Sequence, residues 1–74
     1  MVIDLLDKLN ESGDLKSLFN AGMISGKVIN QRKIYHTYKN RLLSVSKSQS
    51  IIDASKVHRV TTRTTYNVIK SMES

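Results

Sequence analysis

The sequence predicts a small all-α domain of four or five helices, and three observations support this prediction. The chain has 74 residues, enough for one domain, which would bury only about 60% of the surface that its unfolded chain exposes. It contains no proline, and its three glycines all lie in the first third, so helices can run uninterrupted after residue 26. Apolar residues recur at helical spacing, and no stretch of useful length shows the alternation of a strand.

Residues 1–24 are expected to form two short helices that serve as an association segment. The first covers "VIDLLDKLNESG" and ends at Gly13. Its apolar residues at helical spacing are Val2, Leu5, Leu6 and Leu9. The second covers "DLKSLFNAG", with Asp14 as its N-cap and Gly22 as its stop. Its apolar side holds Leu15, Leu18 and Phe19.

Residues 25–45 are expected to form one long helix, "GKVINQRKIYHTYKNRLLSV", capped by Ser25. Its apolar stripe contains Val28, Ile34, Tyr35, Tyr38, Leu42 and Val45. Arg32, His36 and Lys39 lie on the opposite side. Solvent and a phosphate backbone are equally reasonable environments for these three side chains.

Residues 46–74 are expected to continue the same domain as two further helices. Ser46, with Gln49 three residues later, has the spacing of a capping box, so the serine-rich stretch starts a helix rather than forming a linker. Thr61 is a plausible N-cap for a last helix from about residue 62 to residue 72. Its inward arc would hold Thr65, Val68, Ile69 and Met72. Its outward arc would hold Thr62, Arg63, Tyr66, Asn67 and Lys70.

The segment "IIDASKVHRVTTRTTYNVIK" is similar to the helix-turn-helix of DNA-binding proteins, especially that of resolvases and small phage or plasmid regulators. The residues that match the family pattern are Ala54, Ser55, Val60, Thr61, Arg63, Thr64, Tyr66 and Val68. Two positions differ. Arg59 stands where the turn often has a glycine in the left-handed conformation, and Thr65 stands where the family usually has valine.

The resemblance implies that the second helix of this pair enters the major groove of DNA while the first crosses the backbone. Arg63 and Asn67 are the candidates for base readout, because Arg pairs bidentately with guanine and Asn with adenine. The candidates for phosphate contact are Thr61, Thr62, Tyr66, Lys70, Lys47, Lys56 and Arg59.

The charge distribution favours a polyanionic partner for the C-terminal two thirds of the chain. The formal net charge is +6. Residues 1–20 hold four acidic and two basic residues, a net of −2, whereas residues 21–74 hold ten basic and two acidic residues, a net of +8. Charge alone indicates a surface for a polyanion, with a solvated basic face that has no ligand as the alternative. Together with the helix-turn-helix resemblance, it makes double-stranded DNA the expected partner of the basic part.

Several classes of function are not expected. The chain has no cysteine and its two histidines lie far apart in the sequence, so neither a metal nor another cofactor is expected. No apolar run is long enough to cross a membrane, and the acidic N-terminus is unlike a secretory or transit peptide, which favours the cytoplasm, or the nucleus if the host has one. No spacing marks a nucleophile with its base, so an enzyme is not expected.

These observations lead to one main hypothesis and two alternatives. The main one is a sequence-specific DNA-binding protein, a small transcriptional regulator of a phage or mobile element, that forms a homodimer or binds a protein partner through residues 1–24. The first alternative is a DNA-packaging or recombination accessory subunit that recruits an enzyme through residues 1–24. The second is a protein-binding helical adaptor that makes no DNA contact and docks a partner through the apolar faces near Leu5, Leu9, Leu18 and Phe19.

Overall fold

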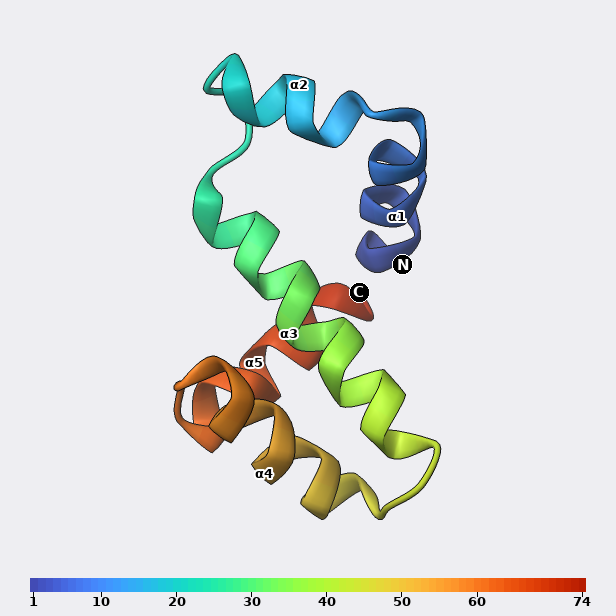
Figure 1. Ribbon diagram of the computed structural model, residues 1–74, viewed down its shortest axis with the longest axis vertical. Coiled ribbons are helices and arrows are strands. Elements are labelled where there is room, and N and C mark those ends of the chain that lie inside the picture. Colours follow the sequence, from blue (N-terminus) through green and yellow to red (C-terminus); the bar gives the residue numbers. More distant parts are fainter.

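A computed structural model describes all 74 residues and consists of five helices without a strand, which confirms the all-α prediction (Figure 1). The helices are α1 (Val2–Ser12), α2 (Asp14–Asn20), α3 (Gly26–Leu42), α4 (Lys47–His58) and α5 (Thr62–Met72). The molecule measures 36 × 20 × 20 Å, with α1 and α2 at one end of its long axis and α4 at the other. None of the helices combines the length and the apolar character needed to cross a bilayer.

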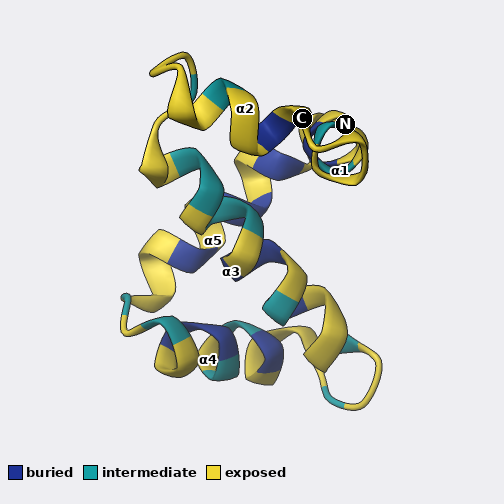
Figure 2. Cartoon of the chain, turned by 45° about the horizontal axis from the view of Figure 1, so that its top comes forward, coloured by how far each residue is buried: buried dark blue, intermediate teal, exposed yellow.

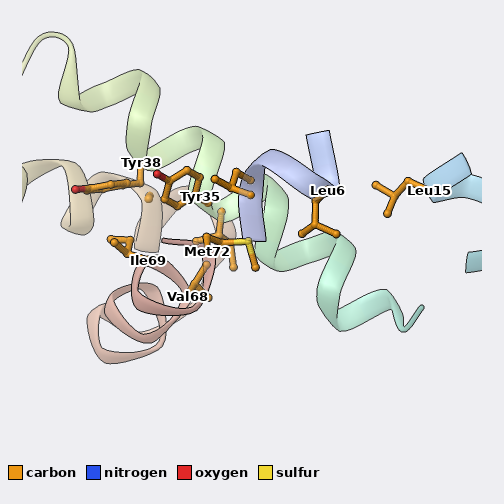
Figure 3. Close-up of a cluster of buried hydrophobic side chains, with 10 residues drawn as sticks. Leu6, Leu15, Tyr35, Tyr38, Val68, Ile69 and Met72 are labelled. Atoms are coloured by element: carbon orange, nitrogen blue, oxygen red, sulfur yellow. The ribbon is translucent and has the colours of Figure 1, made fainter. Parts of the chain in front are cut away.

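α3 is the central helix, and it packs against both α4 and α5. α4 and α5 also pack against each other, and α1 packs against α2 and touches α5. The buried apolar residues form one cluster: Ile3, Leu6, Leu15, Ile34, Tyr35, Tyr38, Ala54, Val68, Ile69 and Met72. Leu6 and Leu15 lie at one end of this cluster, and Tyr38 and Ile69 lie at the other (Figure 3).

A single residue joins α1 to α2. Gly13 has the left-handed conformation (φ 83°) and ends α1 by donating its N–H to the Asn10 carbonyl, as predicted. The predicted N-cap of α2 is wrong, because Gly13 also occupies that position and Asp14 is the first helical residue. The Asp14 carboxylate instead accepts a hydrogen bond of 2.9 Å from the Ser12 hydroxyl.

The buried side of α1 differs in part from the predicted one. Ile3 and Leu6 are buried, whereas Leu5 is 60% exposed. In α2 only Leu15 is buried, and Phe19 is 43% exposed. Apolar residues cover more of α1 than the side that one neighbouring layer can bury, so part of this apolar surface faces solvent (Figure 2).

The start and the buried side of α3 agree with the sequence prediction. The Ser25 hydroxyl accepts a hydrogen bond from the Val28 N–H, and Ile34, Tyr35 and Tyr38 are buried. The helix ends at Leu42, three residues before the predicted end.

Two hydrogen bonds connect the end of the chain to the other helices. The buried Tyr35 hydroxyl donates to the Glu73 carboxylate, just after α5, over 2.9 Å. The Val2 N–H donates to the Ser74 carbonyl over 3.0 Å, and Figure 1 shows the two chain ends side by side. α1, α3 and the end of α5 are therefore held together.

An ion-pair cluster connects α1 to α3. Oδ1 of Asp7 lies 3.0 Å from Nε of Arg32 and 2.7 Å from Nε2 of His36. Burial acts to raise the pKa of Asp7, but the hydrogen bonds and charges of His36 and Arg32 outweigh this effect and lower the pKa. Arg32, His36 and Lys39 were expected to face either solvent or phosphate, and His36 and Lys39 are indeed exposed. Arg32 is half-buried, and both Arg32 and His36 bind a carboxylate of the same chain, which was not expected.

The start of α4 has half of the predicted capping box. The Ser46 hydroxyl accepts a hydrogen bond of 3.2 Å from the Gln49 N–H. The Gln49 side chain, however, donates to Asp53 over 2.8 Å instead of reaching back to Ser46. Arg41 of α3 also donates to the Asp53 carboxylate, so the same acid links α3 to α4.

Candidate nucleic-acid interface

A three-residue turn from Arg59 to Thr61 joins α4 to α5. Arg59 has the left-handed conformation (φ 55°, ψ 45°) that the resemblance to the helix-turn-helix predicted for this position. Its N–H donates to the Lys56 carbonyl, and the Val60 N–H donates to the Ser55 carbonyl over 3.0 Å. This pair of bonds is a Schellman ending, with the half-buried Val60 side chain packed against the core.

Thr61 begins α5 as the predicted N-cap. Its hydroxyl accepts a hydrogen bond of 3.1 Å from the Thr64 N–H and donates one of 3.0 Å to the Thr64 hydroxyl. The one proton of this hydroxyl is therefore already engaged. A phosphate oxygen, which only accepts, would have to compete with Thr64 for it.

Small and hydroxylated side chains meet where α4 crosses α5. Ala54 and Thr65 are completely buried, and Ser55 is nearly so. Oγ of Ser55 lies 2.7 Å from Oγ1 of Thr65 and also 2.7 Å from the Ile51 carbonyl. Because Ser55 has one proton and the carbonyl can only accept, Thr65 donates to Ser55 and Ser55 donates to Ile51. Threonine in place of the family's valine thus forms a buried hydrogen bond between the two helices.

The predicted two-sided pattern of α5 is confirmed. Its inward residues Thr65, Val68, Ile69 and Met72 are all buried. Its outward residues Thr62, Arg63, Tyr66, Asn67 and Lys70 are all exposed (Figure 2). These five outward residues are called the outward arc below.

Two side chains of the outward arc contact each other. Nζ of Lys70 lies 5.8 Å from the centre of the Tyr66 ring, one helical turn away, which is within cation–π distance. Neither Lys70 nor Arg63 forms an ion pair with an acid of the chain. Both cations are therefore available to an anionic partner.

The other predicted phosphate ligands do not all lie together. Lys56 and Arg59 are exposed next to the turn, close in sequence to the start of α5. Lys47 is exposed too, but it is the first residue of α4. At a rise of 1.5 Å per residue it lies about 14 Å from Lys56 along the helix.

The region from α4 to α5 is predominantly basic. Residues 47–72 contain five Lys or Arg residues and one acid, Asp53, a net of +4. The hydrogen bond from Gln49 lowers the pKa of Asp53, and although desolvation opposes this, the bond and charge of Arg41 add to it, so Asp53 is a paired carboxylate. Glu73, the next acid along the chain, accepts a hydrogen bond from Tyr35.

Several polar contacts of the structure could not be identified from the sequence. The Thr37 hydroxyl donates to the Lys33 carbonyl and therefore accepts from Nε2 of His58 at 2.8 Å, linking α3 to the end of α4. The spacing of Arg32 and His36, four residues apart, puts them on one side of a helix, but it does not indicate which acid lies opposite.

The chemistry of this surface has to be inferred from its own side chains. Comparison with protein families, with curated proteins and with solved structures gave no match to this chain. No group of three or more His, Asp or Glu side chains is close enough to hold a metal ion. The outward arc offers a guanidinium, an ammonium, an amide, a phenol and a hydroxyl on one exposed helix.

Proposed function

We propose that this chain binds double-stranded DNA sequence-specifically, with α5 in the major groove and α4 and the turn against the backbone. The observation that carries the proposal is the outward arc, which contains no acidic and no large aliphatic residue on a helix whose opposite side is buried. Its groups are those that contact base edges and phosphates. The similarity of residues 51–70 to helix-turn-helix proteins supports the same arrangement.

The residues of the outward arc have different roles in this proposal. Arg63 lies in the first turn of α5 and Asn67 one turn later, so both are base readers, with guanine and adenine as their preferred bases. Tyr66 and Lys70 act together on the phosphate backbone, since the ring holds the ammonium in place. Lys56 and Arg59 add phosphate contacts next to the turn.

The biological role that fits best is a small transcriptional regulator of a phage or mobile element. A second role is favoured by the exposed apolar side chains of residues 1–24, which include Leu5, Phe19 and Met23. These side chains would suit an accessory subunit that binds DNA and recruits an enzyme. The same side chains are the basis of the third candidate, an adaptor that binds only protein.

The test is to measure affinity for random-sequence duplex DNA at two salt concentrations. Each neutralised phosphate releases condensed counterion, so a dimer with about 6 to 10 phosphate contacts should lose on the order of a thousandfold or more in affinity between about 50 and 200 mM salt. Absence of binding at low salt, or an affinity indifferent to salt, would exclude both DNA roles and leave the adaptor.

A further inference from the structure

Two depressions of opposite character lie on neighbouring helices. One, of about 480 Å³, is on α1 and is lined by Asp4, Leu5, Asp7, Lys8 and Glu11. The other, of about 590 Å³, is on the second half of α3 and is lined by His36, Thr37, Lys39, Asn40 and Leu43. A third depression lies between them and is lined by residues of both helices, among them Asp4, Asp7, His36 and Lys39. Because the third depression shares Asp4 and Asp7 with the first and His36 and Lys39 with the second, the three adjoin one another. They are together called the furrow below, with an α1 half and an α3 half.

The two halves of the furrow carry opposite charge. By formal count the α1 half has three carboxylates and one lysine, a net of −2, whereas the α3 half has Lys39 and no acid. Asp4 pairs with the N-terminal ammonium at 3.2 Å and Asp7 pairs with Arg32 and His36, so Glu11 is the carboxylate of the α1 half without an ion-pair partner in the chain. Each half also contains an unusually exposed leucine, Leu5 at 60% and Leu43 at 85%. The pair between Asp7 and His36, 2.7 Å apart, marks the junction of the halves.

We propose that two copies of this chain associate through the furrow, related by a two-fold axis at the junction. Such an axis places the α1 half of each copy against the α3 half of the other. Glu11 of each copy then lies opposite Lys39 of the other, and neither residue has an ion-pair partner in its own chain, so acid meets base twice. An exposed leucine lies in each contact. Pairing α1 directly with α1 would instead bring Asp4 and Glu11 of the two copies together, and these like charges repel.

A second copy fits this surface better than an unrelated protein of one charge sign. The furrow presents both signs side by side, so a purely basic partner would be repelled by one half and a purely acidic partner by the other. The furrow residues do not include those of the outward arc, so this association is independent of the proposed DNA binding. The furrow is lined by 13 residues, fewer than the roughly 20 to 30 that each partner contributes to a standard interface, which puts the dimer in the weak, transient class.

The experiment is sedimentation of the full chain from about 10 μM to 1 mM at about 50 and 500 mM salt. The chain of 8.4 kDa should approach twice that mass at high concentration and low salt. Glu11→Lys and Lys39→Glu should each weaken the dimer by about tenfold or more, because each reversal affects two contacts. An equimolar mixture of these two variants should associate again, since each reversed charge then meets its opposite.

Two control variants separate charge from apolar contact. Lys27→Glu makes the same charge change at the start of α3, outside the furrow, and should leave the dimer unchanged. Leu43→Ser should weaken it at both salt concentrations. A chain that stays monomeric at about 1 mM and low salt would overturn the proposal. So would a dimer that withstands both charge reversals, or two weakened variants whose mixture does not associate.

Discussion

Arg63 and Lys70 lie on the same arc of α5 but at different positions along the helix, so in the proposed complex they meet different parts of the DNA. Arg63 is in the first turn, the end that a recognition helix usually presents to base edges, and Lys70 lies about two turns further on. Arg63→Ala should relax the preference at one base position and cost about 1 to 3 kcal/mol on the cognate site. Lys70→Ala should weaken binding to all sequences alike and reduce the salt slope by about one unit.

Selection from randomised duplexes, followed by titration of both variants on the selected and a scrambled site, measures this difference. The two variants are controls for each other, since each removes one cation from the same exposed surface. Equal losses on both sites for Arg63→Ala would mean that α5 does not read sequence.

At the scale of single residues, the predictions that rest on short-range hydrogen bonds to the backbone agree best with the structure. The N-caps Ser25, Ser46 and Thr61 were predictable because each depends on a backbone group within a few residues. The left-handed conformation of Arg59 was predictable from the resemblance to the helix-turn-helix, in which this turn position often has a glycine. Asp14 was assigned wrongly because the glycine before it serves both helices. The partners of Arg32 and His36 could not be predicted, since Asp7 lies 25 residues or more away in the sequence.

At the scale of elements, the crossing of α4 and α5 includes the buried hydrogen bond between Ser55 and Thr65. Thr65→Val removes the donor but leaves Ser55 bonded to the Ile51 carbonyl, so it should cost about 1 kcal/mol of stability. Ser55→Ala leaves the buried Thr65 hydroxyl with only its longer, weaker hydrogen bond to the Thr61 carbonyl, at 3.3 Å. This substitution should lower the free energy of unfolding by about 1 to 2 kcal/mol.

The double variant with both substitutions should cost less than the sum of the single costs, because no buried polar group is then left without its partner. Urea unfolding of the wild type, the two single variants and the double variant completes the cycle. Additive costs would mean that this hydrogen bond does not couple the helices.

The buried sides of the helices were predictable where the sequence has a single apolar stripe. α5 has such a stripe, and all four of its predicted inward residues are buried. α1 has apolar residues on more than one side, and the sequence contains no information on which side a distant helix will cover. Ile3 was missed and Leu5 misassigned for this reason.

At the scale of the whole molecule, the contact between Tyr35 and Glu73 gives stability a defined dependence on alkaline pH. Burial, followed by the hydrogen bond and charge of Glu73, raises the pKa of Tyr35 from 10.0 to about 12. Because the folded state favours the protonated phenol, Tyr35 contributes stability that is fully present below pH 10 and is lost as the pH rises through 12. The unfolding free energy should therefore fall by on the order of 2 kcal/mol across this range.

Chemical unfolding of the wild type and of Tyr35→Phe between pH 9 and about pH 12 tests this dependence. The phenylalanine variant should lack this part of the decline, and Tyr66→Phe, which removes an exposed phenol, should retain it. If Tyr35→Phe lost stability with rising pH as steeply as the wild type, ionisation of the Tyr35 phenol would not be the cause of the alkaline decline.

The role of residues 1–24 within the whole molecule was only partly predictable. The sequence indicated an association segment separate from the basic part, whereas Ile3, Leu6 and Leu15 belong to the common core. Composition revealed the opposite charge of this segment but not its contact with α3. That contact depends on tertiary packing between residues far apart in the chain.

The arrangement of charge along the 36 Å axis has a consequence for how the molecule meets a charged surface. The segment of net charge −2 lies at one end, with α1 and α2, and the region of net charge +4 includes α4 at the other end. Residues 21–46, most of them in α3, add a net of +5 between these ends, so the positive charge is centred away from the end that α1 and α2 occupy. If the chain binds DNA as proposed, the field of the phosphates would turn the molecule so that its acidic end points away before contact, and more of its collisions would begin with the basic helices facing the DNA.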